Sequence, residues 1–292
     1  MFVLEQKDAQ NYEKFINYAN FFDDKCIQIV IFPQKMQINL LTYRKYITFV
    51  RNFDSNISIM VKRVEENFTP IWELNPIWDI LTEEQKQWVN NDLEVVYYAK
   101  NAIIHHDGDE SDCMWMLLSG KVRIYKEGIG QRQQIIRLLK PYDLFGYRAV
   151  IADEPYNSSA SAFEPCTVYR LSNECFRRLV SENGQFCYQV MLTMAKDLAI
   201  SEIQTVNLTQ KHIRGRLAES LLQLRRNYGY ESDGCTLAML MPREDLANMS
   251  NMTTSNAIRT LSQFAQEGLV AVDGRRIQIL NEPELERVSR LG

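Results

Sequence analysis

Short apolar runs separated by turn residues fill the chain between positions 93 and 171. The runs are rich in Val, Ile, Leu and Tyr, as β-strands are, and they lie at 95–99, 114–118, 122–125, 135–139, 160–163 and 167–171. Turn residues stand between them, at Asp107-Gly108, Ser119-Gly120, 128–130, Pro141 and 153–155. Because no helical pattern interrupts these strands, we expect an antiparallel barrel or jelly roll.

A helix is expected directly before the strands. Thr82 stands at an N-cap position, and Gln85, three residues later, completes a capping box. Leu81, Trp88 and Val89 supply the apolar side of this helix.

A long helix is predicted after the strands, beginning near Phe186. Its first apolar line recurs at alternating steps of four and three residues, at Cys187, Met191, Met194, Leu198, Ser201, Thr205 and Leu208. A second apolar line runs along another side, at Leu192, Ala199, Ile203 and Val206. Two apolar sides indicate that one packs on the barrel and the other on a partner chain, so we favour a homodimer. A core helix within a single chain is the alternative.

The C-terminal pattern predicts a winged helix. Pro242 occupies the first position of a short helix over Arg243–Met249, residues 250–252 form a turn, and a longer helix covers 253–267 until Gly268 ends it. Residues 269–272 and 276–280 then pair as a β-hairpin around Asp273-Gly274, a favoured type I′ turn pair. Helix, turn, helix and hairpin follow one another as in winged helix-turn-helix domains.

The first turns of the longer helix carry the candidate DNA-reading residues. Thr253, Thr254, Ser255 and, one turn on, Arg259 lie where such a helix contacts base edges in the major groove. Arg259 can bind guanine O6 and N7 bidentately, whereas the hydroxyl side chains discriminate weakly. Candidates for phosphate contacts are Arg243, Arg275, Arg276, Lys211, Arg214 and Arg216.

Composition is that of an ordinary globular chain. It has 292 residues, of which 46% are apolar and 24% charged, and a formal net charge of −4, so DNA binding would depend on one basic face. No unbroken apolar run of about 18 residues predicts a membrane span, and no secretory signal is recognised, so we expect a cytoplasmic protein. The six cysteines stand singly, without the close pairs that bind zinc or an iron–sulfur cluster, and predict free thiols and no metal site.

Several segments in the same order resemble the Crp/Fnr family of bacterial regulators over residues 71–280. They are Lys100-Asn101, His106-Asp107-Gly108-Asp109, Leu118-Ser119-Gly120-Lys121-Val122, Asp143-Leu144-Phe145-Gly146, the long helix, Pro242-Arg243-Glu244-Asp245-Leu246-Ala247 and Ile258-Arg259-Thr260-Leu261. The resemblance implies an α+β protein with a cyclic nucleotide-binding-like jelly-roll barrel. It further implies a homodimer on a two-fold symmetric operator with half-sites about 34 Å apart, an effector in or near the barrel, and RNA polymerase as a partner.

Four regions follow. Residues 1–59 are an N-terminal extension without a clean period, 60–183 the effector-sensing barrel, 184–209 the dimerisation helix and 210–292 the DNA-binding winged helix-turn-helix. Translation from Met60 is one hypothesis for the native start, because an ordinary domain start follows it. A native peptide from before Met60 would exclude it.

The resemblance places the effector pocket at Phe145, Gly146, Tyr147, Arg148, Ser158 and Ser159. Members similar to the cyclic-AMP receptor carry a glutamate after this Phe-Gly segment for the ribose hydroxyl, and a later arginine for the cyclic phosphate. Here Tyr147 takes the first position and residues 156–160 contain no arginine, so cyclic AMP is not expected. Arg148 is adjacent, but a shift of one residue in a strand would point it to the other face.

An iron–sulfur cluster and heme are the other cofactors that the resemblance suggests. The grouped N-terminal cysteines of iron–sulfur members are absent, which argues against a cluster. Heme stays open, since His105, His106 and Cys113 could ligate iron, although a paired histidine in a polar turn is more often exposed. The effector is therefore unknown. The family's operator sequence is not carried over either, because Thr254 and Ser255 stand where many members have Arg and Glu.

Two other function classes agree less well with the sequence. No phosphate-cradling GxxxxGK[ST], GxSxG or HExxH motif supports an enzyme. A cyclic-nucleotide-type sensor module that regulates a protein partner without DNA is the alternative, and the predicted winged helix counts against it. Steeply salt-dependent affinity for DNA would separate the two.

Overall fold

The fold is described from a computed structural model of the chain. The structure describes residues 46–51, 57–62, 71–128, 130 and 132–292. Most of the N-terminal extension lies outside them. Two strands of it are described, β1 (Tyr46–Arg51) and β2 (Ile57–Lys62), which form an antiparallel pair with Thr48 opposite Met60.

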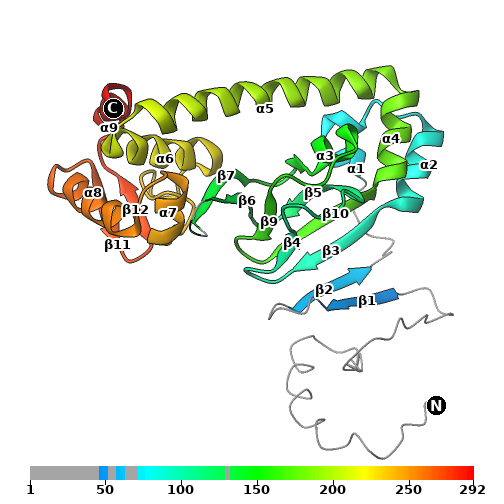
Figure 1. Cartoon of the computed structure of the whole chain (residues 1–292), viewed down its shortest axis with the longest axis horizontal. Coiled ribbons are helices and arrows are strands. Elements are labelled where there is room, and N and C mark those ends of the chain that lie inside the picture. The colour runs from blue at the N-terminus through cyan, green and yellow to red at the C-terminus, as the bar shows by residue number, and fades with distance from the viewer. Residues whose placement is uncertain (1–45, 52–56, 63–70, 129, 131) are drawn as a thin grey trace, which may run out of the picture. The chain divides into compact units, whose positions relative to one another are not determined.

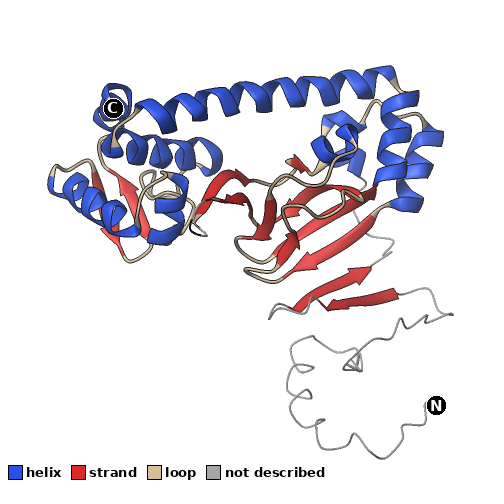
Figure 2. Ribbon diagram, in the orientation of Figure 1, coloured by secondary structure: helices blue, strands red, loops and turns tan. Residues whose placement is uncertain are grey.

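Strands and short helices alternate up to Glu182, and helices dominate afterwards (Figures 1 and 2). The first part contains α1 (Ile71–Leu74), a 3₁₀ turn (Pro76–Trp78), α2 (Glu83–Asp92), β3 (Glu94–Tyr98), β4 (Ile103–His105), β5 (Cys113–Ser119), β6 (Val122–Glu127), β7 (Gln133–Leu139), β8 (Leu144–Phe145), α3 (Tyr147–Ala152), β9 (Ser159–Ala162), β10 (Cys166–Ser172) and α4 (Asn173–Glu182). The second part contains α5 (Gly184–Gln210), α6 (Ile213–Tyr228), α7 (Arg243–Met249), α8 (Thr254–Gln266), β11 (Val270–Asp273), β12 (Arg276–Ile279) and α9 (Glu282–Leu291).

The barrel consists of two four-stranded antiparallel sheets, as the sequence predicts. Their strand orders are β3-β10-β5-β8 and β4-β9-β6-β7. Apolar side chains from both sheets form one buried cluster that includes Val96, Leu117, Val122, Leu139 and Val168. Non-consecutive strands are neighbours in each sheet, so the barrel closes only when distant parts of the chain meet.

Two strands of the barrel are missing from the predicted set. β4 and β8 are only three and two residues long, too short to show an alternating pattern. The predicted strand at 160–163 begins one residue earlier, at Ser159. Gly120 explains the tight turn between β5 and β6, because its φ is +83° and a Cβ there would lie 2.2 Å from the Pro165 carbonyl oxygen.

The predicted capping box at the start of α2 is confirmed and also ties this helix to α5. Thr82 Oγ1 accepts a hydrogen bond from the Gln85 N–H, and the Gln85 side chain accepts one from the Thr82 N–H. Asn183, the N-cap of α5, donates to the same Gln85 oxygen at 2.8 Å. The ends of α2 and α5 are therefore fixed together.

The winged helix agrees with the sequence except at the wing turn. Asp273 pairs with Arg276, so the two central residues of the turn are Gly274 and Arg275. Of these, Gly274 has a positive φ, at +55°, which matches a type II′ turn rather than the expected type I′ turn on Asp273-Gly274. Pro242 serves as the N-cap of α7 and not as its first helical residue.

The barrel and the winged helix share a contact along the β6–β7 hairpin. Arg123 of β6 forms an ion pair of 2.7 Å with Asp245 of α7, and both side chains are largely buried. Tyr125, Ile135 and Leu138 belong to the same apolar cluster as the core of the winged helix. Burial raises the pKa of Asp245, and the Arg123 guanidinium opposes that effect.

Breaking this ion pair from one side should cost more than removing both charges. Arg123→Gln or Asp245→Asn leaves a largely buried charge without its counter-ion, whereas the double variant leaves none. We expect the double variant to lose less unfolding free energy than the two single variants lose together, by roughly 1–3 kcal/mol. Denaturant unfolding of the four proteins measures this coupling, and additive losses would contradict it.

Aromatic rings fill the barrel interior around His105. Its ring stacks on Tyr156, with centroids 4.0 Å apart, and lies 6.4 Å from the Phe145 ring. Neither ring nitrogen of His105 has a hydrogen-bond partner of good geometry among the described residues. Burial lowers the pKa of His105 to about 4 from the ordinary 6.5.

Acidification should therefore destabilise the barrel through His105. Because the folded-state pKa is lower than the unfolded one, the neutral ring contributes stability above pH 6.5 that is lost as the pH falls to about 4. The full loss is about 3 kcal/mol. His105→Phe keeps the ring stacking and removes the titration, so its unfolding free energy should fall less over this interval. Identical pH dependence in both proteins would contradict the assignment.

Candidate DNA-binding interface and effector region

Helix α8 buries one face and exposes the other. Thr253 caps it by accepting a hydrogen bond from the Asn256 N–H at 3.3 Å. Ala257, Leu261 and Phe264 are buried in the core of the winged helix, and α7 packs against this side through Leu246 and Ala247. The opposite face is available to a partner.

The exposed face of α8 holds the predicted base-reading residues. Thr253, Thr254, Ser255 and Arg259 are all exposed at its N-terminal end. The Arg259 guanidinium donates to the Asn256 side chain, which holds it along the helix surface. Ile258 is also exposed on this face, at 47%, and sequence reasoning missed it because an apolar residue in a helix suggests the core. Such a side chain can meet a thymine methyl group.

The arginines predicted to contact phosphates differ in whether their side chains already have partners in the protein. Arg275 has no side-chain partner among the described residues. Arg243 instead donates to the Gly274 carbonyl and so ties α7 to the wing, and Arg276 lies 3.3 Å from the Glu231 carboxylate. These roles remain predictions for all three residues.

The basic residues near the start of α6 take part in internal contacts. Lys211 contacts Glu219 and Ser289, and Arg214 makes two hydrogen bonds to the Glu267 carboxylate. Arg216 donates to the Leu208 carbonyl at 3.2 Å. A DNA phosphate would compete with these partners, which makes the three residues weaker candidates than Arg275.

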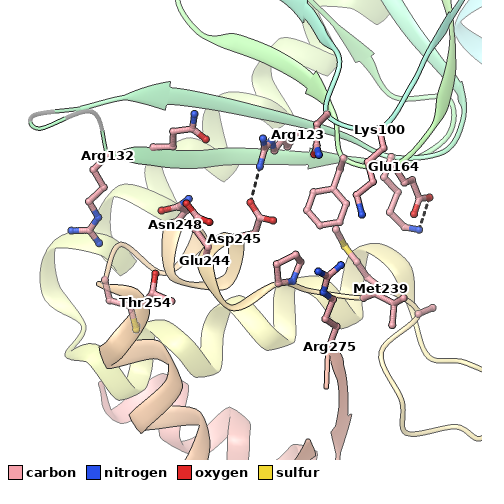
Figure 3. Close-up of a pocket in the computed structure, with 18 of the residues that line it drawn as sticks. Lys100, Arg123, Arg132, Glu164, Met239, Glu244, Asp245, Asn248, Thr254 and Arg275 are labelled. Atoms are coloured by element: carbon pink, nitrogen blue, oxygen red, sulfur yellow. Dashed lines mark hydrogen bonds and ion pairs between the residues drawn. The ribbon is translucent and has the colours of Figure 1, made fainter. Parts of the chain in front are cut away.

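A cavity of about 1050 Å³ lies where the barrel meets the winged helix (Figure 3). The barrel lines it with Lys100, Arg123 and Arg132, and the winged helix lines it with residues that include Thr254 and Arg275. Three of the predicted DNA-contact residues, Thr253, Thr254 and Arg275, therefore line the same cavity as barrel side chains. Sequence reasoning did not anticipate this, because the contact joins segments that are far apart in the chain.

The predicted effector segment contacts α5 directly. Tyr147, at the start of α3, donates its hydroxyl hydrogen to Asp197 of α5, and Arg137 of β7 donates to the same carboxylate oxygen. Burial, followed by the Asp197 contact, raises the pKa of Tyr147 above its ordinary range. Tyr147 thus connects the segment after Phe145 and Gly146 to the long helix.

The predicted effector-pocket residues Arg148, Ser158 and Ser159 have surroundings different from that of Tyr147. Arg148 lies in α3, not in a strand as expected, and its partly exposed side chain is 3.5 Å from the Glu154 carboxylate. The Ser159 hydroxyl accepts a hydrogen bond from the Asp107 N–H at 3.0 Å, and Ser158 is half-buried. The pocket assignment therefore remains a prediction.

The two adjacent histidines have opposite environments. His106 is exposed, as expected for a polar turn, whereas His105 is buried in the barrel. A heme ligated by His105 would need room beside its ring. The rings of Tyr156 and Phe145 lie there, with centroids 4.0 Å and 6.4 Å from that of His105. No group of three or more His, Cys, Asp or Glu side chains among the described residues could hold a metal ion.

Helix α5 exposes an apolar strip that its own chain leaves uncovered among the described residues. Of the predicted seam, Met191, Leu198, Ser201 and Thr205 are exposed, whereas Met194 packs against an apolar cluster that α2, α3 and α4 share with β5 and β10, and Leu208 is half-buried. Ile203 and Val206 of the second line are exposed too, so this line does not face the barrel. The barrel side is instead marked by Phe186 and Val190.

Two family models match the chain, and together they cover more than half of it. A cyclic nucleotide-binding domain matches residues 95–183, and a Crp-like helix-turn-helix domain matches residues 215–288. These ranges coincide with the barrel and the winged helix. No helix among the described residues is long and apolar enough to cross a membrane.

Individual proteins agree with the two domain matches. A CRP-like cAMP-activated global transcriptional regulator of Mycobacterium tuberculosis is 22% identical over 199 residues, which are 68% of this chain and 89% of that protein. A Crp/Fnr-family transcriptional regulator of Eubacterium rectale has a similar fold, with a TM-score of 0.63 and 20% sequence identity. The match covers 74% of this chain and 98% of that one. FixK2 of Bradyrhizobium japonicum superposes with a TM-score of 0.61 at 23% identity, covering 67% and 96%.

The barrel, the long helix and the winged helix thus occur in one order in this chain and in those regulators. Both domains match family models, and the matched relatives are transcription regulators. This protein belongs to the Crp/Fnr family of DNA-binding transcriptional regulators.

Proposed function

We propose that the protein acts as a homodimer on a two-fold symmetric operator, with α8 of each chain in the major groove. The observation that carries this proposal is the exposed N-terminal face of α8, with Thr254, Ser255, Ile258 and Arg259 on a helix whose other face is buried. Hydroxyl, apolar and guanidinium groups together can read base edges. The alternative of a sensor without DNA binding is not favoured, because the winged helix is complete in the described residues.

The apolar strip of α5 supports the homodimer. Tyr188, Met191, Leu198, Ile203 and Val206 are each at least half exposed in the single chain. A second α5 placed against this strip would bury it on both copies, as in a two-helix coiled coil. Dimerisation would also place two α8 helices for neighbouring half-sites.

The effector proposal concerns the barrel. Several relatives are named as cyclic-AMP-activated, but in this chain Tyr147 uses its hydroxyl on Asp197 and is not a carboxylate that could hold a ribose hydroxyl. We therefore propose an effector other than cyclic AMP, whose binding acts on α5 through the Tyr147–Asp197 contact. RNA polymerase is the further partner proposed for the DNA-bound dimer, and no catalytic activity is proposed.

Selection of bound sequences from a random DNA pool with the full chain tests the proposal, in arms with and without cell extract. Enrichment of a two-fold symmetric site supports a dimeric DNA-binding regulator, and dependence on extract supports an effector. Absence of enrichment in both arms would overturn the proposal.

Arg259→Ala should relax readout at one base pair in each half-site. Loss of a bidentate guanine contact costs roughly 1–3 kcal/mol per site. Repeating the selection with the variant measures the change. Arg287→Ala is the control, because it removes an exposed arginine from α9 that pairs with Glu284 within its own helix. An unchanged sequence preference with Arg259→Ala would show that α8 does not read a base pair through this residue.

Leu198→Glu should dissociate the dimer. The Leu198 side chain is 63% exposed in the single chain, and burying it on both copies contributes about 3 kcal/mol, or roughly 100-fold in dimer affinity. Sedimentation equilibrium measures the change. Ile200→Glu is the matched control, because Ile200 is exposed on the same helix but lies about 200° around its axis. Equal effects of both variants would contradict the assigned face.

A further inference from the structure

The β6–β7 hairpin of the barrel ends beside the N-terminus of α8. The hairpin is held on α7 by the Arg123–Asp245 ion pair and by a hydrogen bond of 3.4 Å from the Gln134 side chain to the Met249 carbonyl. Arg132 precedes β7 at the end of this hairpin, and it lines the same cavity as Thr253 and Thr254. Figure 3 shows its side chain extending from the hairpin toward the side on which Thr254 lies.

Arg132 lines this cavity without an ion pair among the described residues, as Lys100 does, whereas Lys121 and Arg123 each have a carboxylate partner. Lys121 pairs with Glu164 at 2.8 Å and Arg123 pairs with Asp245, whereas the Arg132 side chain has no hydrogen bond or ion pair with the described residues. The Arg132 backbone carbonyl accepts a hydrogen bond of 2.8 Å from the Gly128 N–H within the hairpin. The positive charge of Arg132 adds to burial in lowering the pKa of Arg216. The Glu244 carboxylate also lines the cavity, on the winged-helix side.

The neighbourhood of Arg132 is favourable for a phosphate. The first N–H groups of α8 have no acceptor within the helix, and the N-terminus of a 13-residue helix carries a partial positive charge. Hydroxyl groups of Thr253 and Thr254 stand at the same place. Phosphates that flank a recognition helix in the major groove are bound by such groups.

We propose that the DNA interface extends onto the barrel, with Arg132 contacting the operator backbone next to the N-terminus of α8. The proposal rests on the function proposed above. The occupant is a phosphodiester of duplex DNA, because the free cation lines the same cavity as the N-terminus of the helix proposed to read the bases. This contact positions the protein and carries no sequence information.

Salt-dependent binding of the full chain to the selected operator and to an unrelated duplex tests the proposal. One lost phosphate contact makes the slope of log affinity against log salt shallower by about 0.9 for each protomer, or about 2 for a dimer. Arg132→Ala should therefore lower the affinity for both duplexes by roughly 10-fold per protomer at 0.1 M salt. The ratio of the two affinities should not change. Arg132→Lys should restore the slope.

Lys126→Ala is the matched control. Lys126 lies in the same hairpin and is partly exposed, but its ammonium group already contacts Asp107 and the Asn157 carbonyl, and it does not line the cavity. Its loss should leave the slope unchanged. Equal melting temperatures of the variants would show that the barrel stays folded.

Three results would overturn the inference. An unchanged slope with Arg132→Ala would mean that Arg132 meets no phosphate, and tighter binding would mean that the hairpin obstructs DNA. Arg132-dependent binding of inorganic phosphate with an unchanged DNA slope would mean that a small anion occupies the site. Absence of DNA binding by the unmodified chain in both duplexes would reject the proposed function together with this inference, whereas the first three results reject only the inference.

Discussion

Helix α5 must satisfy two neighbours at once, and the arrangement of the other elements depends on how it does so. Its first turns bury Phe186 and Val190 in a second apolar cluster, which α2, α3 and α4 share with β5 and β10 and where the Trp78 ring centroid lies 5.2 Å from that of Phe186. One turn after another, the helix then leaves that cluster, and Asp197 and Gln204 replace apolar contacts with polar ones to β7 and α3. The remaining face stays apolar and exposed, although exposing several large apolar side chains on one strip is unfavourable in water. A second copy of the helix, as proposed, would remove that cost without altering the barrel side.

The β6–β7 hairpin imposes the second constraint, because it fixes the winged helix against the barrel. Its apolar residues join the core of the winged helix, and the Arg123–Asp245 pair is enclosed at the edge of that contact. A largely buried ion pair adds little net stability, since desolvation offsets most of the attraction. It penalises any rearrangement that separates its partners, however, because each charge would then need water. The pair therefore favours one placement of α7 over neighbouring ones, and this placement brings Thr254 and Arg132 to the same cavity.

Local sequence patterns predicted most of the helices and strands. They did not predict contacts between segments that are distant in the sequence. The capping box at Thr82, helix α7, helix α8 and the antiparallel barrel follow from spacing and turn residues, all within short windows. The two shortest strands carried too few residues to show a period, and the wing turn shifted by one residue because the pairing of Asp273 with Arg276 decides which residues are central. Burial of His105 depended on the opposite sheet, so its adjacent partner His106 gave no hint of it. The Tyr147–Asp197 and Arg123–Asp245 contacts were hidden for the same reason.

Net charge is a poor guide to DNA binding in this chain, because the placement of unpaired cations matters more than their number. The formal charge is −4, and many arginines are neutralised by carboxylates, as Arg214 is by Glu267 and Arg170 is by Glu94 and Asp112. DNA would have to displace a carboxylate to use such a residue, and the lost ion pair would offset the new one. Arg132, Arg259 and Arg275 have no carboxylate partner among the described residues, and all three belong to the recognition helix, the wing or the cavity beside them. Cations without carboxylate partners on one face would allow an acidic protein to bind DNA there, in agreement with the role proposed for α8.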